Sequence, residues 1–596
     1  MFRSRIVGGV TNAGDHRRWA RPAVWLIAAV AGGAYAWGIA QQKPQLYYAA
    51  VARSMSMSWH NFVFAAFDPE ARLSVDKLPG AFWAQALSVR IFGAHVWAVV
   101  LPQVIWGVLT ILLLYRVVRR VSGPWPAVAA AAVAACVPVT VALNRGNLPD
   151  SLLVLLLVAA VDRVLAALES DRRRDLVWAG VLIGAAFQVK MVQAWLVVPV
   201  IGVALLVTAP AGRLRRRIAD TALFGVVALV FSLSWMTVVS LVPAHDRPYV
   251  DGSHDNSLFE QVFLYNAADR TDNAFSVGAA NFAVGDDGRN YRSALVLGPD
   301  DHLAHIFTGG GGRDAGWLVP LALAALIALA VLARRRGRTD PRTAALVLWG
   351  GWLLVYLAVF LVIGTVNPYY LAALAPPIAA LIGMAVAEYG SAPTRMRRVA
   401  LVAVLATVAY GWWLLAPAPP TLRWVTLSVA LALCALAVAT RAVIPLLLAA
   451  LAAPAVAAAA LVVGGYGCLD MPFESAQTSA ITQRFVGEAF DEAGGLLAKL
   501  DKDMPNARYP IVAHTSMVAS PFIFVSGREI PSIGGYTGTA PAISVDDLAR
   551  MVARHEIGIV LLARADDDRV RWVEGHCKHL PGDSGSSIQA YVCAAR

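Results

Sequence analysis

The sequence predicts an all-α, polytopic membrane protein of about 13 transmembrane helices, followed by a small extracytoplasmic α/β domain. Three observations support this fold class. First, 58% of the 596 residues are hydrophobic and only 15% are charged, whereas soluble proteins carry about 25% charged residues. Second, apolar runs of about 20 residues, the length that spans a bilayer, recur along the chain. Third, short arginine clusters separate these runs, which is the charge pattern of cytoplasmic loops.

The order of these runs and clusters predicts the topology of the transmembrane domain, residues 1–465. A basic start precedes the first run and no small-residue cleavage site follows it, so we expect an uncleaved first helix and a cytoplasmic N-terminus. An odd number of spans then leaves the C-terminal domain outside the cytoplasm. The net charge of +11 lies mostly in the cytoplasmic loops, so nucleic acid is not an expected partner. The predicted spans are 22–40, 95–115, 124–143, 151–167, 176–189, 194–209, 221–243, 315–333, 343–365, 370–388, 399–416, 424–440 and 442–464.

The C-terminal segment, residues 466–596, differs in character from the rest of the chain. Its apolar stretches are short and alternate with helix-like segments, which predicts a small α/β domain. One of these helices begins with the capping pattern Ser544-x-x-Asp547. The glycine-rich segment 534–538 does not open a helix, so we expect a turn there.

Two long polar loops are expected at the outer face of the membrane, the first outer loop at 41–81 and the large outer loop at 244–314. Loops that a rigid scaffold holds often carry binding and catalytic residues. In the first outer loop Lys77 directly follows Asp76. A compact ammonium beside a carboxylate at the membrane surface suits a substrate that carries a phosphate. The aromatic residues of this loop either line a substrate surface or belong to the interfacial aromatic belt.

Further polar residues lie at the outer ends of predicted spans. Asp150 follows a proline at the start of the fourth span, where it is either a helix cap alone or a cap that also belongs to a site. Lys190 ends the fifth span and either extends to the membrane interface or faces a substrate. Tyr369 and Tyr370 lie where the ninth span meets the tenth.

The sequence assigns no residue to a metal. The histidines of the large outer loop lack the HExxH spacing of a zinc site, and no CxxC motif accompanies them. No cofactor is certain, although a divalent metal remains possible. Cys577 and Cys593 could form a disulfide if the C-terminal domain lies outside the cytoplasm.

Four segments carry a resemblance to a known family: YYAAVARSM, FDPEARLSVDKLPGAFW, NRGNLPDSLL and NPYYLAALAPPIAALIG. They resemble the GT-C superfamily of polyprenyl-phosphate-sugar-dependent glycosyltransferases. The nearest group is the bacterial protein-mannosyltransferase-like branch with the YkcA/YkcB-like mannosyltransferases, and GGYTGTAPAISVDDLARMV resembles the tail domain of that group. The lipid A aminoarabinose transferase is a more distant relative. The resemblance covers the first ten spans.

The resemblance implies a conserved helical core and a first outer loop that carries the catalytic carboxylate. It also implies a sugar donor on a polyprenyl phosphate, transfer with inversion, and a cell-envelope glycan, lipid or protein as the acceptor. The reaction is then expected at the outer face of the plasma membrane, with a sugar of the mannose or arabinose type.

Residues are carried over only where the motifs match. Asp76 and Lys77 occupy the family's acidic-Lys-Pro-Pro motif, in which the lysine meets the donor phosphate, although this chain reads DKLP. Many relatives have an Asp-Glu pair where this chain has Pro44-Gln45, so Asp76 or Asp68 must act as the base. Asp150 matches the acidic residue after the second outer turn. The expected phosphate-binding residues are therefore Lys77, Tyr369 and Tyr370. The expected substrate-binding residues are Asp150 and, from their positions in the first outer loop or at a span end rather than from a family motif, Tyr47, Tyr48, His60 and Lys190.

Two other functions fit the same composition. A transporter or flippase for a lipid-linked sugar would place its polar residues near the middle of the membrane, often on broken helices. This chain gathers them in its outer loops, which favours an enzyme. A family member that binds the lipid without catalysis is the second alternative, because the usual Asp-Glu pair is absent.

Overall fold

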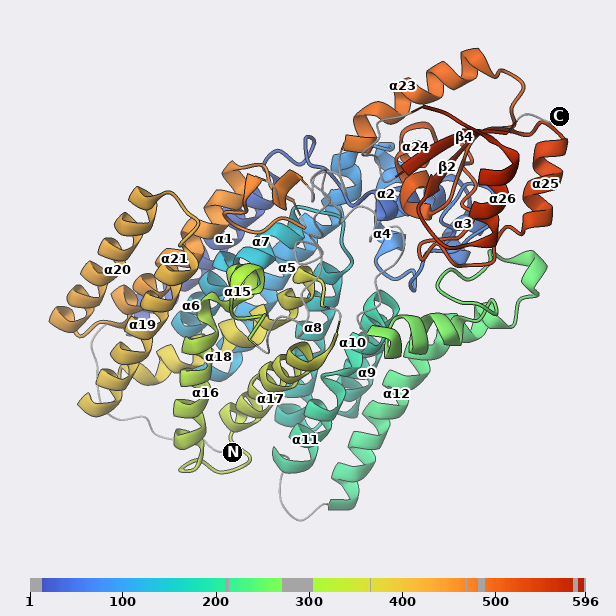
Figure 1. Ribbon diagram of the computed structural model, residues 1–596. Helices are drawn as coiled ribbons and strands as arrows, with labels where there is room; N and C mark the ends of the chain where they lie inside the picture. Colours follow the sequence, from blue (N-terminus) through green and yellow to red (C-terminus); the bar gives the residue numbers. More distant parts are fainter. Residues whose placement is uncertain are drawn as a thin grey trace.

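Helices form most of the protein in the computed structural model, which describes residues 13–208, 214–270, 304–364, 366–467, 469–476, 478–480, 488–581 and 588–593 (Figure 1). Residues 271–303 of the predicted large outer loop lie outside this range. The transmembrane domain contains α1 (Ala13–Ala36), α5 (Val96–Ser122), α6 (Pro124–Cys136), α7 (Pro138–Asn144), α8 (Asp150–Ser170), α9 (Arg173–Lys190), α10 (Val192–Trp195), α11 (Val198–Thr208), α12 (Leu214–Ser240), α15 (Gly309–Ala315), α16 (Val319–Ala333), α17 (Pro341–Val362), α18 (Ala375–Tyr389), α19 (Thr394–Leu414), α20 (Pro420–Thr440) and α21 (Val443–Val463).

Each predicted span coincides with a helix or with a pair of consecutive helices, and the prediction of a polytopic membrane protein is confirmed. Within the described part of the chain, nine helical segments are long and apolar enough to cross a membrane, or ten if the bent pair α6–α7 is one span. The remaining three predicted spans are α1, α9 and α10–α11. Helix α9 carries three charged residues in its first turn and a lysine at its end, and α11 is only 11 residues long. The count of 13 spans therefore stays a prediction.

The third predicted span is bent by 67° between α6 and α7. Pro138 is the first residue of α7, and Val137 before it has an extended backbone with φ −72° and ψ 118°. A proline disfavours the helical conformation of the preceding residue and lacks the N–H that would continue the ladder. The turn after α7 contacts the first outer loop, where the side chain of Asn147 accepts the N–H of Gln45.

The first outer loop is folded rather than extended. It contains α2 (Leu46–Met57) and α3 (Trp59–Phe64), and it is followed by α4 (Phe82–Phe92). Nine of the twelve residues of α2 are buried, because α2 packs against both α4 and α24 (Ser516–Ser526), a helix of the C-terminal domain, called the tail domain below.

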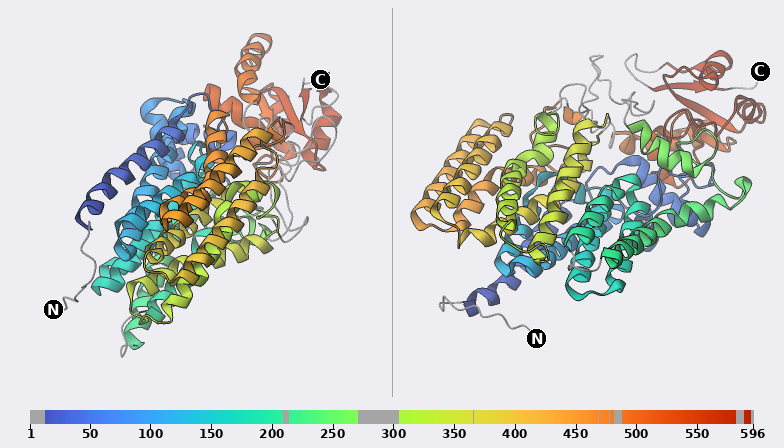
Figure 2. Two further views of the ribbon diagram at one scale, coloured as in Figure 1. Left: turned by 90° about the vertical axis from the view of Figure 1, so that its left-hand side faces the viewer. Right: turned by 90° about the horizontal axis from the view of Figure 1, so that it is seen from below.

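The C-terminal part forms a four-stranded sheet with flanking helices, which confirms the predicted α/β domain. The strands are ordered β1-β2-β4-β3; β1 and β2 are parallel, and the other neighbours are antiparallel. Figures 1 and 2 show this domain at one end of the helical bundle, beside α2, α3 and α4. Its elements are α23 (Glu488–Asp503), β1 (Tyr509–Ala513), α24 (Ser516–Ser526), α25 (Val545–Ala553), β2 (Ile557–Ala563), α26 (Asp568–His576), β3 (Lys578–His579) and β4 (Ile588–Val592).

Two local features of the tail domain agree with the sequence. Ser544 and Asp547 form a reciprocal capping box at the start of α25, which satisfies backbone N–H groups that have no partner inside the helix. A disulfide joins Cys577 to Cys593, between the end of α26 and the end of β4.

Candidate active site

Short strand-like contacts hold the segment that ends at Asp76. The N–H of Val75 donates to the carbonyl of Ala65 at 2.7 Å, and the N–H of Ser74 donates to the carbonyl of Tyr249 at 2.8 Å. The first outer loop is therefore paired with itself and with the loop that follows α12. After the lysine, Gly80 lies against α9: a Cβ at this position would come within 2.7 Å of the backbone carbonyl of Gln188. These contacts fix the backbone on both sides of Asp76 and Lys77.

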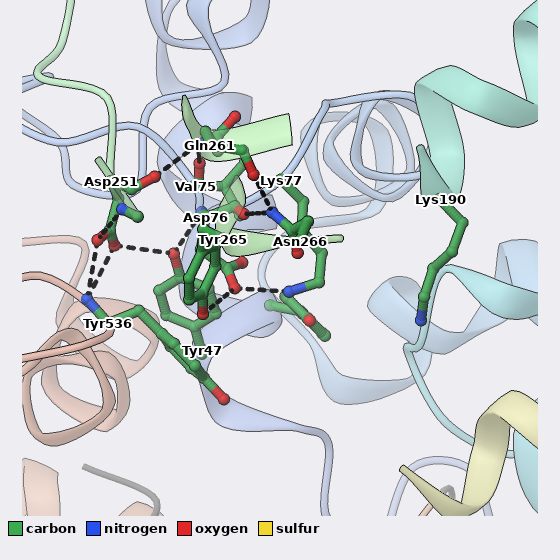
Figure 3. Close-up of polar contacts among 12 residues, drawn as sticks. Tyr47, Val75, Asp76, Lys77, Lys190, Asp251, Gln261, Tyr265, Asn266 and Tyr536 are labelled. Atoms are coloured by element: carbon green, nitrogen blue, oxygen red, sulfur yellow. Dashed lines mark hydrogen bonds and ion pairs between the residues drawn. The ribbon is translucent and has the colours of Figure 1, made fainter. Parts of the chain in front are cut away.

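Asp76 is completely buried and is the centre of a polar cluster (Figure 3). Its Oδ2 accepts from the Lys77 ammonium at 2.5 Å and from the Tyr265 hydroxyl at 3.2 Å. Its backbone N–H donates to the Tyr47 hydroxyl at 2.8 Å, and its carbonyl accepts from Asn266 at 2.8 Å. Its other carboxylate oxygen, Oδ1, has no partner among the described residues. Asp76 is thus held by its backbone and by one carboxylate oxygen, and its second carboxylate oxygen is buried without a hydrogen-bond partner among the described residues.

Asp251, in the loop after α12, is a second buried carboxylate of the cluster that sequence reasoning missed. The Tyr47 hydroxyl donates to its Oδ2 at 3.3 Å, so that Tyr47 connects it to the backbone of Asp76. Burial, reinforced by the nearby charge of Asp76, raises the pKa of Asp251 to about 7. The sequence signal was slight: Asp251 is one of several acidic residues in that loop.

Lys77 is 5% exposed and lies among aromatic rings. Its Nζ is 5.4 Å from the centre of the Tyr48 ring and 5.8 Å from that of Tyr536, a residue of the tail domain. Burial lowers the pKa of Lys77, and the charge of Asp76 opposes this effect. A further cation, Arg270, lies 5.0 Å from the Tyr265 ring. The cluster therefore brings two cations, Lys77 and Arg270, close to two carboxylates, Asp76 and Asp251, with tyrosine rings beside them.

A second buried ion pair lies beside this cluster. Lys190, the last residue of α9, donates to Asp150 Oδ2 at 2.8 Å, and the two side chains are 4% and 2% exposed. The Lys190 ammonium is 4.1 Å from the centre of the Tyr370 ring and 4.8 Å from that of Tyr369. Figure 3 shows Lys190 separate from the residues around Asp76. Four of the predicted site residues thus form one group: Asp150, Lys190, Tyr369 and Tyr370.

Two predicted residues lie outside both groups. The carboxylate of Asp68 accepts the backbone N–H groups of Arg72 and Leu73, each at 2.8 Å, so both of its oxygens order the turn that precedes Asp76. His60 is exposed on α3, and its Nε2 lies 3.1 Å from the carbonyl oxygen of Asp246. This geometry favours Asp76 over Asp68 as the base and gives His60 no place beside Lys77.

Gln45 stands where many relatives have an acidic pair, and the structure gives it a role in the fold. Its side chain accepts from the N–H of Tyr48 at 2.7 Å and so caps α2. Its backbone is paired with the Asn147 amide, which accepts the N–H of Gln45 at 2.8 Å and donates to its carbonyl at 2.9 Å. Arg145, fully buried in the same turn, donates to carbonyls near the ends of α1 and α21. The turn between α7 and α8 therefore positions the start of α2.

Among the residues that the structure describes, no group of three or more His, Cys, Asp or Glu side chains is arranged to hold a metal ion. The carboxylates of the cluster bond instead to an ammonium, phenols and backbone N–H groups.

Comparison with known proteins identifies two family matches and two similar curated proteins. Residues 76–235 match the family described as "Dolichyl-phosphate-mannose-protein mannosyltransferase". Residues 496–576 match "Putative mannosyltransferase YkcB-like, C-terminal". The "Putative mannosyltransferase YycA" of Bacillus subtilis (strain 168) is 28% identical and aligns with 91% of this chain and 92% of its own length. The "Putative mannosyltransferase YkcB" of the same organism is 27% identical, with 91% of this chain and 89% of that protein aligned.

Solved structures share the fold over nearly the whole chain. ArnT from Cupriavidus metallidurans bound to undecaprenyl phosphate is 17% identical and superposes with a TM-score of 0.58, covering 98% of this chain and 100% of that one. The Archaeoglobus fulgidus oligosaccharyltransferase is 14% identical, with a TM-score of 0.51 and coverage of 97% and 74%. The likeness extends through both the helical domain and the tail domain.

Proposed function

We propose that this chain is a GT-C glycosyltransferase of the YkcB-like, protein-mannosyltransferase-like branch, to which it is similar, and that it transfers a sugar from a polyprenyl phosphate to an acceptor hydroxyl of the cell envelope. ArnT, which has the same fold, binds undecaprenyl phosphate. The observation that carries the proposal for this chain is the buried Asp76, which has one oxygen paired with Lys77 and one without a partner among the described residues.

Asp76 is proposed as the general base. A base must lie within hydrogen-bond reach of the proton that it removes, and its Oδ1 accepts no other hydrogen bond in the described structure. The acceptor oxygen then attacks the sugar carbon while the bond from that carbon to the phosphate oxygen breaks. The proton goes to Asp76, and the bonding electrons leave with the phosphate. A single displacement of this kind inverts the configuration at the sugar carbon.

The cations of the site are proposed to bind the donor phosphate. The phosphate gains negative charge as the bond breaks, and fixed positive groups in a site that excludes water stabilise that charge. Lys77 lies directly beside the proposed base, and Arg270 lies against the Tyr265 ring of the same cluster. Lys190 supplies a further ammonium, and the adjacent Tyr369 and Tyr370 supply two phenol groups.

The site is proposed to lie at the outer face of the membrane. This proposal rests on the arginine-rich loops, which favour a cytoplasmic N-terminus and a tail domain outside the cytoplasm. The sugar is proposed to be mannose, as the names of the relatives suggest, or arabinose. The acceptor is proposed to be a glycan, a lipid or a protein of the envelope.

The test is transfer in proteoliposomes, with labelled polyprenyl-phosphate mannose and arabinose and with envelope extracts as acceptors. We expect product from the wild type and none from Asp76→Asn, whose amide cannot take the proton. Lys77→Met is expected to weaken binding of the donor lipid as well as transfer. Asp566→Asn, which changes a 94% exposed carboxylate of the tail domain, is the matched control and should equal the wild type.

Three outcomes would contradict the proposal. Equal rates for Asp76→Asn and the wild type would remove Asp76 as the base. Movement of the intact donor lipid across the membrane, without any product, would identify a transporter, and binding of the lipid with neither transfer nor movement would identify a non-catalytic member of the family.

A further inference from the structure

A loop of the tail domain, residues Gly534–Gly538, bonds to a carboxylate of the active-site cluster. The backbone N–H of Tyr536 lies 2.9 Å from Asp251 Oδ2 and 3.1 Å from its Oδ1. Gly535 has a φ of +66°, a backbone conformation that residues other than glycine rarely adopt. A Cβ at this position would also overlap Asp251 Oδ1. The close approach therefore requires glycine at this position.

The same loop brings Tyr536 into the proposed substrate site. Its ring centre is 4.7 Å from that of Tyr47 and its ring is 5.8 Å from the Lys77 ammonium. Figure 3 shows the Tyr536 side chain extending from Asp251 past Tyr47, with its hydroxyl away from the Asp76 carboxylate. Whereas the neighbouring hydroxyls of Tyr47 and Tyr265 donate to carboxylates, that of Tyr536 forms no hydrogen bond with the described residues.

A separate set of contacts holds the tail domain on the first outer loop, so the loop at Asp251 is not an isolated contact. The N–H of Glu70 donates to Glu529 Oε2 at 2.8 Å, and the Arg72 guanidinium donates to the Tyr509 hydroxyl at 2.6 Å. Burial and the nearby Asp68 raise the pKa of Glu529 to about 9, which favours the uncharged form of this carboxyl beside Asp68. Helix α24 also packs against α2.

We propose that the tail domain completes the active site, and that Tyr536 contacts the sugar being transferred. This inference rests on the proposed function, in which Lys77 binds the phosphate. The sugar is bonded to that phosphate, so it lies within a few ångströms of Lys77, where the Tyr536 ring also lies. An aromatic face covers the apolar face of a sugar, and a phenol hydroxyl can bond to its hydroxyl groups. The lipid chain, by contrast, must run toward the bilayer.

Gly535 is proposed as a positioning residue in the same arrangement. Its lack of a side chain allows the N–H of Tyr536 to reach Asp251, and Asp251 in turn accepts from Tyr47, which accepts from the backbone of Asp76. Moving the loop Gly534–Gly538 away from Asp251 would therefore disturb the proposed base, Asp76, as well as the proposed contact of Tyr536 with the sugar.

The first experiment measures binding without turnover. Donor lipid carrying the sugar and the same polyprenyl phosphate without sugar are titrated against the wild type, Tyr536→Ala and Tyr536→Phe. We expect Tyr536→Ala to bind the sugar-bearing lipid about tenfold more weakly and the sugar-free lipid as the wild type does, with a smaller loss for Tyr536→Phe, which keeps the ring. Equal losses for both lipids, or no loss, would overturn the sugar contact.

The second experiment tests the position of the loop. Hydrogen exchange of the Tyr536 amide should be slow in the wild type and at least about tenfold faster in Gly535→Ala and in Asp251→Ala. Gly575→Ala, at an exposed glycine of α26 whose added Cβ meets no atom within 4 Å, is the control and should leave that amide slow. Fast exchange in the wild type would overturn the docking.

Steady-state kinetics then separate the sugar contact of Tyr536 from the positioning role of Gly535. They also separate this inference from the proposed transferase function. Tyr536→Ala should mainly raise KM for the donor, whereas Gly535→Ala should also lower kcat. If the wild type transfers sugar and both variants equal it, the inference fails while the proposed function stands. If the wild type transfers nothing, the proposed function fails, and binding and hydrogen exchange still decide the inference.

Discussion

The buried ion pair of Asp150 and Lys190 allows one prediction that links the thermal stability of the protein to its transfer activity. Removing one member leaves an uncompensated buried charge, which costs about 3–5 kcal/mol. Asp150→Asn tests this cleanly because the expected capping role is not observed: Asp150 is the first residue of α8, whose N-cap is Pro149 without a side-chain cap hydrogen bond, so the variant removes a charge and no cap. Lys190→Met leaves the buried carboxylate of Asp150 without its ion-pair partner. Both single variants should therefore unfold in detergent at clearly lower temperatures than the wild type.

The double variant, Asp150→Leu with Lys190→Met, separates the structural role from the proposed phosphate-binding role. Replacing both charges by apolar side chains is often neutral for stability, so its unfolding temperature should return close to that of the wild type. Transfer should stay low, because the phosphate lacks the Lys190 ammonium. Recovery of both stability and transfer would refute the phosphate-binding role. Unchanged stability in both single variants would refute the buried ion pair itself.

Three further predictions follow from the contacts around the site. Gly80→Ala should lower stability by about 1–3 kcal/mol and impair transfer, because its Cβ would meet the Gln188 backbone; thermal unfolding and the transfer assay measure this. The raised pKa of Glu529 means that the folded protein holds an extra proton between about pH 5 and 9. Docking of the tail domain should therefore weaken as pH rises through this range, by at most about 1.4 kcal/mol per pH unit, and Glu529→Gln should flatten the dependence of tail hydrogen exchange on pH. Replacing Cys577 and Cys593, 16 residues apart, by serine should destabilise the tail domain by about 3 kcal/mol without changing the binding of sugar-free polyprenyl phosphate.

Local patterns in the sequence were sufficient for much of the fold. Long apolar runs and arginine clusters indicate membrane helices without reference to any other part of the chain. The capping residues Ser544 and Asp547 likewise signal a helix start through a contact three residues apart. The number of spans was harder to predict, because α9 carries charges at both of its ends and α11 is short, so hydropathy alone does not decide whether these helices cross the bilayer.

The candidate site was predictable where its residues are adjacent in sequence or match the family motifs. Asp76 and Lys77 are neighbours, and their ion pair is a local feature. Asp251 and Tyr536 lie 285 positions apart, and no periodicity or propensity indicates that they meet. The turn at 534–538 was expected from its glycines, but its contact with the cluster depends on how the tail domain packs on the first outer loop.

Asp68 is a residue that the sequence suggests for the site but that the structure uses elsewhere. As an acidic residue of the first outer loop it was an alternative base, but both of its oxygens accept backbone N–H groups. Sequence position alone does not reveal whether a carboxylate is already used by the fold.

The most direct test of the proposed mechanism is the configuration of the sugar in the product. Wild-type enzyme would be given a polyprenyl-phosphate sugar of known anomeric configuration, and the linkage in the product would be determined by NMR. Direct attack assisted by Asp76 predicts inversion, because one displacement occurs at the sugar carbon. Retention would require a covalent sugar–enzyme intermediate and would contradict the role of Asp76 as a general base.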